Sequence, residues 1–294
     1  STPGERMPLL LLATLLWALS FGLIKRELGG LDPNFVAWAR MALALPLLLP
    51  FLRVRELSLW PGPRWRSAAK LVAIGAVQYG MMYTGYLAAF GFAQAHEVAL
   101  FTVTTPLYVS LLHDAWARRF DPVNLGLALL AVLGAVVLQP RSWTVAGAWL
   151  GFALVQASNL CFAVGQIAYR RVRRQAPQVR DHAVFAWLYL GGLLVTTVTV
   201  SLADSWSELA EVDGRQTWTL LYLGVIATGA GFFLWNRGAV TAPAAALAVF
   251  NNLKIPLAVA VALTIFGERA DLPRLALGGG LMLLAASLAA RRGA

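Results

Sequence analysis

The stretch LLLLATLLWALSFGLI, at residues 9–24, contains no charged side chain and is followed at once by Lys25 and Arg26. With its flanking residues it reaches the length of about 20 residues that a helix needs to cross the hydrocarbon core of a bilayer. A secretion signal ends in small residues at a cleavage site, whereas this run ends in two basic residues. We therefore expect a retained membrane-spanning helix here.

The composition of the whole chain agrees with this interpretation. Of its 294 residues, 59% are hydrophobic and 13% are charged, and the mean hydropathy is +0.67. Soluble domains average about 45–50% apolar and about 25% charged residues. The composition excludes a disordered chain and an ordinary soluble enzyme, and the single cysteine, Cys161, excludes a disulfide scaffold. We expect an all-α polytopic membrane protein.

Hydropathy and helix-breaking residues predict ten transmembrane helices joined by short connections. Their expected ranges are 8–28, 33–52, 68–90, 94–113, 121–139, 145–169, 182–204, 216–238, 241–266 and 271–290. Spans of this length leave no room in the chain for a soluble domain of ordinary size.

Lysine and arginine residues in the connections predict the orientation. Sixteen of the 24 basic residues fall on the side that includes both chain ends, six fall on the other side, and Arg40 and Lys254 lie inside spans. Because cytoplasmic loops carry the excess of basic residues, we expect both termini in the cytoplasm and the spans in the plasma (bacterial inner) membrane. The net charge of +10 is then an orientation signal and predicts no nucleic-acid partner.

The two halves of the chain resemble each other when one is shifted by about 145–150 residues. Each half holds five spans, an odd number, so the second half lies inverted in the membrane relative to the first. We expect a first five-helix repeat at 1–143 and an inverted second repeat at 144–294. The matched positions are Gly75, Gly80 and Tyr86 with Gly224, Gly229 and Trp235, then Ala99, Phe101 and Pro106 with Ala248, Phe250 and Pro256, and finally Asp121 and Leu125 with Asp271 and Leu275.

Inverted repeats are common in secondary transporters, which bind substrate near the midplane, between the repeats and beside interrupted helices. Pro106 and Pro256 lie in mid-span at matched positions, and each removes one helical hydrogen bond. We expect both prolines to interrupt their helices and to act in gating. A simple bend, which is common in membrane helices, is the alternative.

Four short motifs accompany this layout: WALSF at 17–21, PNFVAWAR at 33–40, YLGVI at 222–226 and FGER at 266–269. Together with the five-plus-five arrangement, they resemble the EamA-domain branch of the drug/metabolite transporter superfamily over nearly the whole chain, and most of all its aromatic amino acid exporters. The resemblance implies export of small organic metabolites, here amino acids including aromatic ones, by alternating access. A drug-like cation or a nucleotide sugar is the alternative cargo.

Lys254 is the strongest candidate for contact with a substrate. It lies near the middle of the ninth expected span, and Asn251 shares its helix face. Charged groups in hydrocarbon are costly and normally face a partner or an aqueous cavity. A cation at this depth suits a substrate that bears a carboxylate. The alternative is a structural lysine bonded to carbonyls that Pro256 frees.

Other deep polar and aromatic side chains predict a cavity for a flat, amphipathic ligand, with core packing as the alternative for some of the aromatic ones. Arg40 either reaches this cavity or is tied to Glu97 or a carbonyl. His96 and Glu97 open the fourth span and are candidates for pH or proton coupling, with an interfacial cap as the alternative. The predicted substrate-binding residues are Lys254, Asn251, Asn252, Trp17, Ser20, Tyr79, Tyr83, Thr102, Thr105, Gln156, Asn159, Trp187 and Trp235.

The sequence contains no motif for enzymatic chemistry. It has no P-loop for ATP, no cluster of His, Cys and Asp with metal-ligand spacing, and no nucleophile with its base at one depth. We expect no enzymatic activity, no cofactor and no metal. The expected partners are an amino-acid-like small molecule and the lipid bilayer, and both a monomer and a homodimer fit the sequence.

Overall fold

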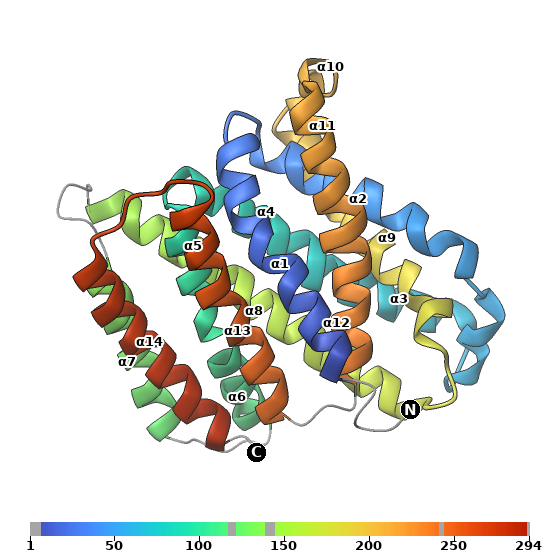
Figure 1. Ribbon diagram of the computed structural model, residues 1–294. Helices are drawn as coiled ribbons and strands as arrows, with labels where there is room; N and C mark the ends of the chain where they lie inside the picture. The colour runs from blue at the N-terminus through green and yellow to red at the C-terminus, as the bar shows by residue number, and fades with distance from the viewer. Residues whose placement is uncertain (1–6, 117–121, 139–144, 241–243, 293–294) are drawn as a thin grey trace.

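The computed structural model describes four stretches of the 294-residue chain: residues 7–116, 122–138, 145–240 and 244–292. Within these stretches the regular structure is helical and contains no strand (Figure 1). The chain is therefore an all-helical, polytopic membrane protein. Five helical stretches are long and apolar enough to cross a membrane: Pro8–Glu27, Pro33–Phe51, Trp149–Gln175, Asp181–Leu202 and Gly214–Ala239.

Helix occupies most of each range that hydropathy predicts. The described helices of the first half are α1 (Met7–Glu27), α2 (Pro33–Leu48), α3 (Arg64–Gly75), α4 (Met82–Ala88), α5 (Ala95–Phe101), α6 (Thr105–Trp116) and α7 (Pro122–Leu138). Those of the second half are α8 (Val145–Gln175), α9 (Asp181–Leu202), α10 (Glu208–Glu211), α11 (Gly214–Leu221), α12 (Gly231–Ala239), α13 (Ala244–Thr264) and α14 (Leu272–Arg292). Two π-helical stretches, η4 (Ala76–Met81) and η8 (Tyr222–Ala230), join α3 to α4 and α11 to α12 without a break.

Two helices extend four or more residues beyond the ranges that hydropathy predicts. α3 begins at Arg64, four residues before the expected start at 68, and α8 continues to Gln175, six residues past the expected end at 169. Both extensions are rich in arginine, which lowers the hydropathy but forms helices readily. Basic residues at the C-terminal end of α8 also interact favourably with the helix dipole.

The two matched prolines differ in their effect on the helix. Just before Pro106, a 3-10 turn, η6 (Thr102–Thr104), separates α5 from α6. The expected interruption at Pro256 is wrong, because α13 continues through it as a single helix. A proline removes only one N–H donor, and a membrane helix can continue where its surroundings compensate the freed carbonyl.

Contacts between helices come in pairs that exchange the two halves of the chain. α1 packs against α13 and α12, and in the same way α8 packs against α5, α6 and α4. α2 lies against η8, as α9 lies against η4. α2 also pairs with α9, and α7 with α14, across the halves (Figure 1). These contacts pair corresponding elements of the two halves.

Matched glycines allow two close helix crossings in this arrangement. A Cβ atom on Gly75 would lie 1.8 Å from the Leu188 carbonyl oxygen of α9, and one on Gly224 would lie 2.5 Å from the Leu43 Cβ of α2. Gly75 ends α3 just before η4, and Gly224 lies inside η8. The third and eighth expected spans therefore have a π-helical irregularity and a close contact at corresponding places.

Candidate functional site

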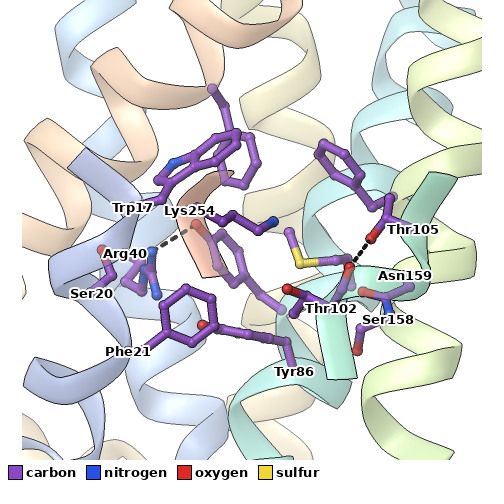
Figure 2. A pocket seen from close by; sticks show the side chains of 14 residues that line it. Trp17, Ser20, Phe21, Arg40, Tyr86, Thr102, Thr105, Ser158, Asn159 and Lys254 are labelled. Atoms are coloured by element: carbon purple, nitrogen blue, oxygen red, sulfur yellow. Dashed lines mark hydrogen bonds between the residues drawn. The ribbon is translucent and has the colours of Figure 1, made fainter. Parts of the chain in front are cut away.

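A cavity lies between helices of both halves of the chain. Its empty space, with the open solvent at its mouth included, is about 590 Å³. Figure 2 shows the cavity from close by. Its lining residues are Trp17, Ser20, Phe21, Arg40, Met82, Tyr83, Tyr86, Thr102, Thr105, Ser158, Asn159, Phe162, Phe232 and Lys254.

Helical spacing explains why three helices each contribute a group of side chains. Side chains three or four positions apart lie on one helix face, so a single turn can present three of them to the same cavity. The groups are Trp17, Ser20 and Phe21 on α1, then Met82, Tyr83 and Tyr86 on α4, and Ser158, Asn159 and Phe162 on α8.

Lys254 brings a positive charge into the cavity from α13. Its Nζ donates a hydrogen bond to Asn251 Oδ1, one turn earlier, at 3.1 Å, and lies 5.5 Å from the centre of the Trp17 ring. In Figure 2 its side chain extends into the space between Arg40 and Thr105. Among the described residues no carboxylate forms an ion pair with Lys254. An ammonium group in this setting can bind a carboxylate on a ligand.

Arg40 of α2 supplies a second positive charge to the lining. Its side chain is buried, and Nε donates to Thr228 Oγ1 at 3.1 Å while Nη2 donates to the Tyr83 hydroxyl at 2.9 Å. The guanidinium carbon also lies 4.3 Å from the centre of the Tyr83 ring, a cation–π contact. The alternative tie to Glu97 is wrong, because the Glu97 carboxylate accepts a bond from the backbone N–H of Gln94 instead.

The cavity is electropositive. Arg40 and Lys254 are the charged residues of its lining, and the described lining contains neither aspartate nor glutamate. Because a buried charge is costly unless an opposite charge or hydrogen bonds compensate it, this lining favours an anionic ligand over a cationic one.

Aromatic rings form an apolar wall of the cavity. The Trp17 Nε1 donates to the Ala227 carbonyl at 2.8 Å, which fixes the orientation of the indole. The Trp17 and Phe232 ring centres lie 4.8 Å apart, and those of Phe162 and Phe232 lie 5.9 Å apart, all with tilted planes. Such a wall can pack against a flat apolar part of a ligand.

Hydroxyl and amide groups line the side of the cavity away from Arg40 (Figure 2). Asn159 Nδ2 donates to the Phe101 carbonyl and to Thr104 Oγ1, each at 3.0 Å. Thr105 Oγ1 donates to the Thr102 carbonyl at 2.8 Å. These bonds satisfy backbone and side-chain groups at the 3-10 turn, where the regular helical ladder is interrupted.

Comparison with known proteins assigns the family. Residues 7–139 and, separately, residues 149–291 match the EamA-like transporter family. The chain belongs to this family. It is therefore a transporter and not an enzyme, as the sequence predicts. A solved crystal structure has the same fold, with a TM-score of 0.66 and 20% sequence identity over 98% of this chain and 97% of its own.

Curated relatives of this EamA-like transporter extend over most of its length. A biotin transporter of Salmonella typhimurium is 37% identical over 280 residues, which are 94% of this chain and 90% of the relative. A probable biotin transporter of Pseudomonas aeruginosa is 38% identical over 281 residues, 94% and 95% of the two chains. A probable amino-acid metabolite efflux pump of Salmonella typhimurium is 25% identical over 237 residues, 78% and 76% of the two chains.

In this EamA-like transporter, about half of the predicted substrate-binding residues come together. Asn251 is buried and accepts the hydrogen bond of Lys254, and the side chain of Asn252 lies outside the described residues. The binding roles of all these residues stay predictions. The predicted residues in the lining are Lys254, Trp17, Ser20, Tyr83, Thr102, Thr105 and Asn159.

Besides Asn251, four further predicted residues lie outside the lining. Tyr79 is fully buried in the core, and Trp187 packs against the same core. Trp235 lies next to the lining, with its ring centre 5.3 Å from that of Trp17. Gln156 supports the hydroxyl and amide network by bonding to the Phe101 carbonyl at 3.2 Å.

The other lining residues lie outside the predicted set, although the sequence carries signals for several of them. Phe162 occupies the position matched to Trp17 in the repeat, and Phe232 the position matched to Tyr83. Phe21 follows Trp17 at a spacing of four on one helix face. The full set comprises Phe21, Arg40, Met82, Tyr86, Ser158, Phe162 and Phe232.

His96 and Glu97 are not part of the lining and instead begin α5. The Glu97 carboxylate accepts the backbone N–H of Gln94 at 2.8 Å and completes a capping box. Glu268, in the loop after α13, accepts bonds from the backbone N–H groups of Ala95 at 3.0 Å and His96 at 3.2 Å, and lies 2.7 Å from the His96 ring Nδ1. The alternative of a helix cap is therefore present here, and the role of both residues in proton coupling stays a prediction.

Lys25 completes this group of charges from the end of α1. Its Nζ donates to the Phe90 carbonyl at 2.7 Å and to the Ala93 carbonyl at 3.1 Å. We name Lys25, His96, Glu97 and Glu268 the α5 cap cluster, which joins α1, α5 and the loop after α13.

Burial opposes ionisation of the Glu268 carboxyl in the α5 cap cluster. The hydrogen bonds from the His96 side chain and from the backbone N–H groups of Ala95 and His96 outweigh this effect and hold the pKa of Glu268 below its usual range. Glu268 is therefore an ionised cap at neutral pH.

Proposed function

We propose that this EamA-like transporter carries a small monocarboxylate of the biotin type and binds it in the cavity with the carboxylate at Lys254. The observation that carries the proposal is a cavity with cationic groups, aromatic rings and hydroxyls but no carboxylate in its described lining. The curated names of relatives at 37% and 38% identity, a biotin transporter and a probable biotin transporter, support this class of cargo.

The chemistry of biotin matches the cavity group by group. Its carboxylate is complementary to the Lys254 ammonium, and its apolar thioether ring can pack against Trp17 and Phe232. Its ureido group offers one carbonyl acceptor and two N–H donors, which polar groups of the lining such as the Ser20 hydroxyl can engage. A free amino acid also carries an ammonium group, which the described lining does not meet with a carboxylate.

We further propose ten transmembrane helices in two inverted repeats, 1–143 and 144–294, with both termini on the cytoplasmic side of the inner membrane. The paired helix contacts and the two separate family matches support the repeats. The distribution of basic residues supports the orientation. Rocking of the repeats about the cavity then gives alternating access, with Pro106 and Pro256 near the moving segments.

Amino acids, aromatic ones included, are the second candidate cargo. The relative that is a probable amino-acid metabolite efflux pump supports this candidate. The aromatic wall suits an aromatic side chain, and Lys254 suits its carboxylate. Drug-like cations are disfavoured because Arg40 and Lys254 would repel them.

Counterflow in proteoliposomes tests the proposed cargo. Vesicles preloaded with biotin should accumulate labelled biotin, and biotin amide, which lacks the negative charge, should compete at least about tenfold more weakly. Lys254→Met should lower biotin counterflow by about tenfold or more, whereas Lys70→Met, at an exposed lysine of α3, should leave it unchanged.

The same vesicles separate the two candidates. Counterflow of tryptophan, phenylalanine or threonine without counterflow of biotin would replace the first candidate by the second. Flux of a dye cation alone would refute both. Wild-type flux in Lys254→Met would show that Lys254 does not bind the cargo.

A further inference from the structure

Arg40 carries a donor that the protein leaves unused. Its side chain is only 2% exposed, and Nε and Nη2 are bonded to Thr228 and Tyr83, but Nη1 has no hydrogen-bond partner among the described residues. A buried donor on a charged group is costly to leave without a partner. Arg40 also belongs to the lining of the cavity. A bound solute is a natural partner for this donor.

We propose that Arg40 is the second anchor of the site, and that Nη1 donates to a neutral carbonyl-type oxygen at the end of the solute remote from its carboxylate. This inference rests on the proposed function, in which Lys254 holds the carboxylate. It assigns the cavity to solutes with two separated polar ends, a carboxylate at one and an uncharged acceptor at the other. A ureido carbonyl is such an acceptor.

The bonds that Arg40 already makes decide which of its donors is left for the solute. Two parallel N–H donors of one guanidinium edge are the usual bidentate arrangement. The Tyr83 and Thr228 hydroxyls accept from Nη2 and Nε and lie 2.8 Å apart, so they occupy the Nε/Nη2 edge. Nη1 is the guanidinium nitrogen that remains without a partner among the described residues, and because Lys254 holds the carboxylate in the proposed function, Nη1 is assigned to the uncharged end of the solute. Lys254, whose described hydrogen bond is to Asn251, has further N–H donors for the carboxylate.

The surroundings of Arg40 hold its guanidinium in place before a solute binds. The Tyr83 and Thr228 hydroxyls lie 2.8 Å from each other, and they lie 2.9 and 3.1 Å from the guanidinium nitrogens that they bond, which closes a triangle of polar contacts. Tyr83 belongs to the first half of the chain and Thr228 to the second. Figure 2 places Arg40 beside Ser20, on the side of the cavity away from Thr102 and Thr105. A preorganised donor improves selectivity because little freedom is lost on binding.

The test compares biotin with its thiourea analogue, in which sulfur, a weaker acceptor, replaces the ureido oxygen and the net charge is unchanged. Binding is measured by competition in the counterflow assay and by calorimetry on the purified transporter. The wild type should prefer biotin by about tenfold or more, the effect of one hydrogen bond to a charged donor. Arg40→Lys, which keeps the charge but loses the guanidinium donor, should abolish this preference.

Two matched variants separate recognition from structural support. Thr228→Val breaks a contact of Arg40 but keeps Nη1, so it should retain the preference for oxygen over sulfur. Lys254→Met should lose the preference for biotin over biotin amide while it keeps the preference for oxygen over sulfur. Thermal unfolding of each variant shows that it is folded.

Three results overturn the inference or the proposal beneath it. A wild type that binds biotin and its thiourea analogue equally well excludes the Arg40 donor. Equal loss of both ligands in Arg40→Lys and Thr228→Val means that Arg40 only ties helices together. A wild type that binds neither ligand refutes the proposed cargo itself.

Discussion

The α5 cap cluster offers a test of gating, because one carboxylate holds the start of α5 to the loop after α13. We consider Glu268→Ala, with Glu268→Gln as the milder variant. Glu268 accepts two backbone N–H groups, from Ala95 and His96, and contacts the His96 ring at 2.7 Å. If these bonds exist only when the transport path is closed at this end, their loss shifts the transporter toward the conformation that is open there.

The structure sets the size of this shift. Loss of an N-cap costs about 0.5–2 kcal/mol, and loss of a hydrogen bond to a charged group costs about 1.5–3 kcal/mol. The two costs overlap because the same carboxylate makes all the bonds, so they do not add. About 2–3 kcal/mol remains for Glu268→Ala, which corresponds to about a 30- to 150-fold change in the equilibrium between conformations. Glu268→Gln should change it less, since an amide oxygen can still accept one bond.

Accessibility of the cavity from one side measures this equilibrium. Ser20 lines the cavity and Cys161 is the single native cysteine, so Ser20→Cys in a Cys161→Ser background provides one reporter thiol. Its reaction with a membrane-impermeant maleimide, applied to intact cells, should accelerate in Glu268→Ala until the open conformation dominates. Glu211→Ala, at an exposed carboxylate on α10, serves as the control.

The pH dependence of the same reaction has a defined sign. The pKa of Glu268 is held below its usual range in the folded protein. Its stabilising effect is therefore fully present above the pKa of the unfolded chain, about 4.3, and is lost as the pH falls through the lower pKa of the folded state. Titration of Glu268 therefore causes no change in the maleimide reaction rate between about pH 5 and 8. Unchanged thiol reactivity in both Glu268 variants, together with a lower melting temperature, would refute gating and leave the cluster as a helix cap.

Three further predictions concern packing, charge and stability. Gly75→Ala should destabilise the fold by about 1–3 kcal/mol, because the added Cβ would lie 1.8 Å from a carbonyl oxygen of α9. Gly280→Ala, where the added Cβ meets open space, should leave the stability unchanged. Thermal unfolding in detergent compares the two variants. Asn159→Asp adds a carboxylate to the cavity and should weaken biotin binding by about tenfold or more at pH 7.5, as measured by calorimetry; equal affinity would contradict an anionic cargo. Burial opposes ionisation of Glu56, but hydrogen bonds from Arg180 hold the pKa of Glu56 below its usual range, so the stabilisation from this carboxylate is lost on acidification below about pH 4.3. Glu56→Gln should therefore reduce the dependence of the melting temperature on pH in this acidic range. An unchanged pH profile in Glu56→Gln would show that the Glu56–Arg180 contact does not contribute to the acid dependence of stability.

The positions of the helices follow closely from the sequence, because an apolar stretch in a bilayer must satisfy its backbone internally and becomes helix. The ends of the helices are less predictable. Arginine at 64 and at 170–174 lowers the hydropathy without breaking the helix, so α3 and α8 are longer than expected. The sequence also does not show that α13 continues through Pro256, because the packing around a membrane helix decides whether a proline interrupts it.

The lining of the cavity is predictable only where helix faces can be assigned. Tyr79 and Tyr83 are four residues apart and share a face in a regular α-helix. A π-helical stretch between Ala76 and Met81 lies at this point and rotates the residues on either side of it relative to each other. Tyr83 consequently faces the cavity while Tyr79 packs in the core. Hydropathy contains no signal for such a local change of helical pitch.

The repeats supply symmetry to the helices but not to the charges of the cavity. Lys254 and Thr105 occupy matched positions in the two halves, and both line the cavity, yet one carries a charge and the other a hydroxyl. Arg40, from the first half, is held by Thr228 from the second. A symmetric scaffold gives the two access states similar energies, as the proposed alternating access needs. In the proposed function, an asymmetric lining then fixes the solute in one orientation, so the same two cations can select its two different ends.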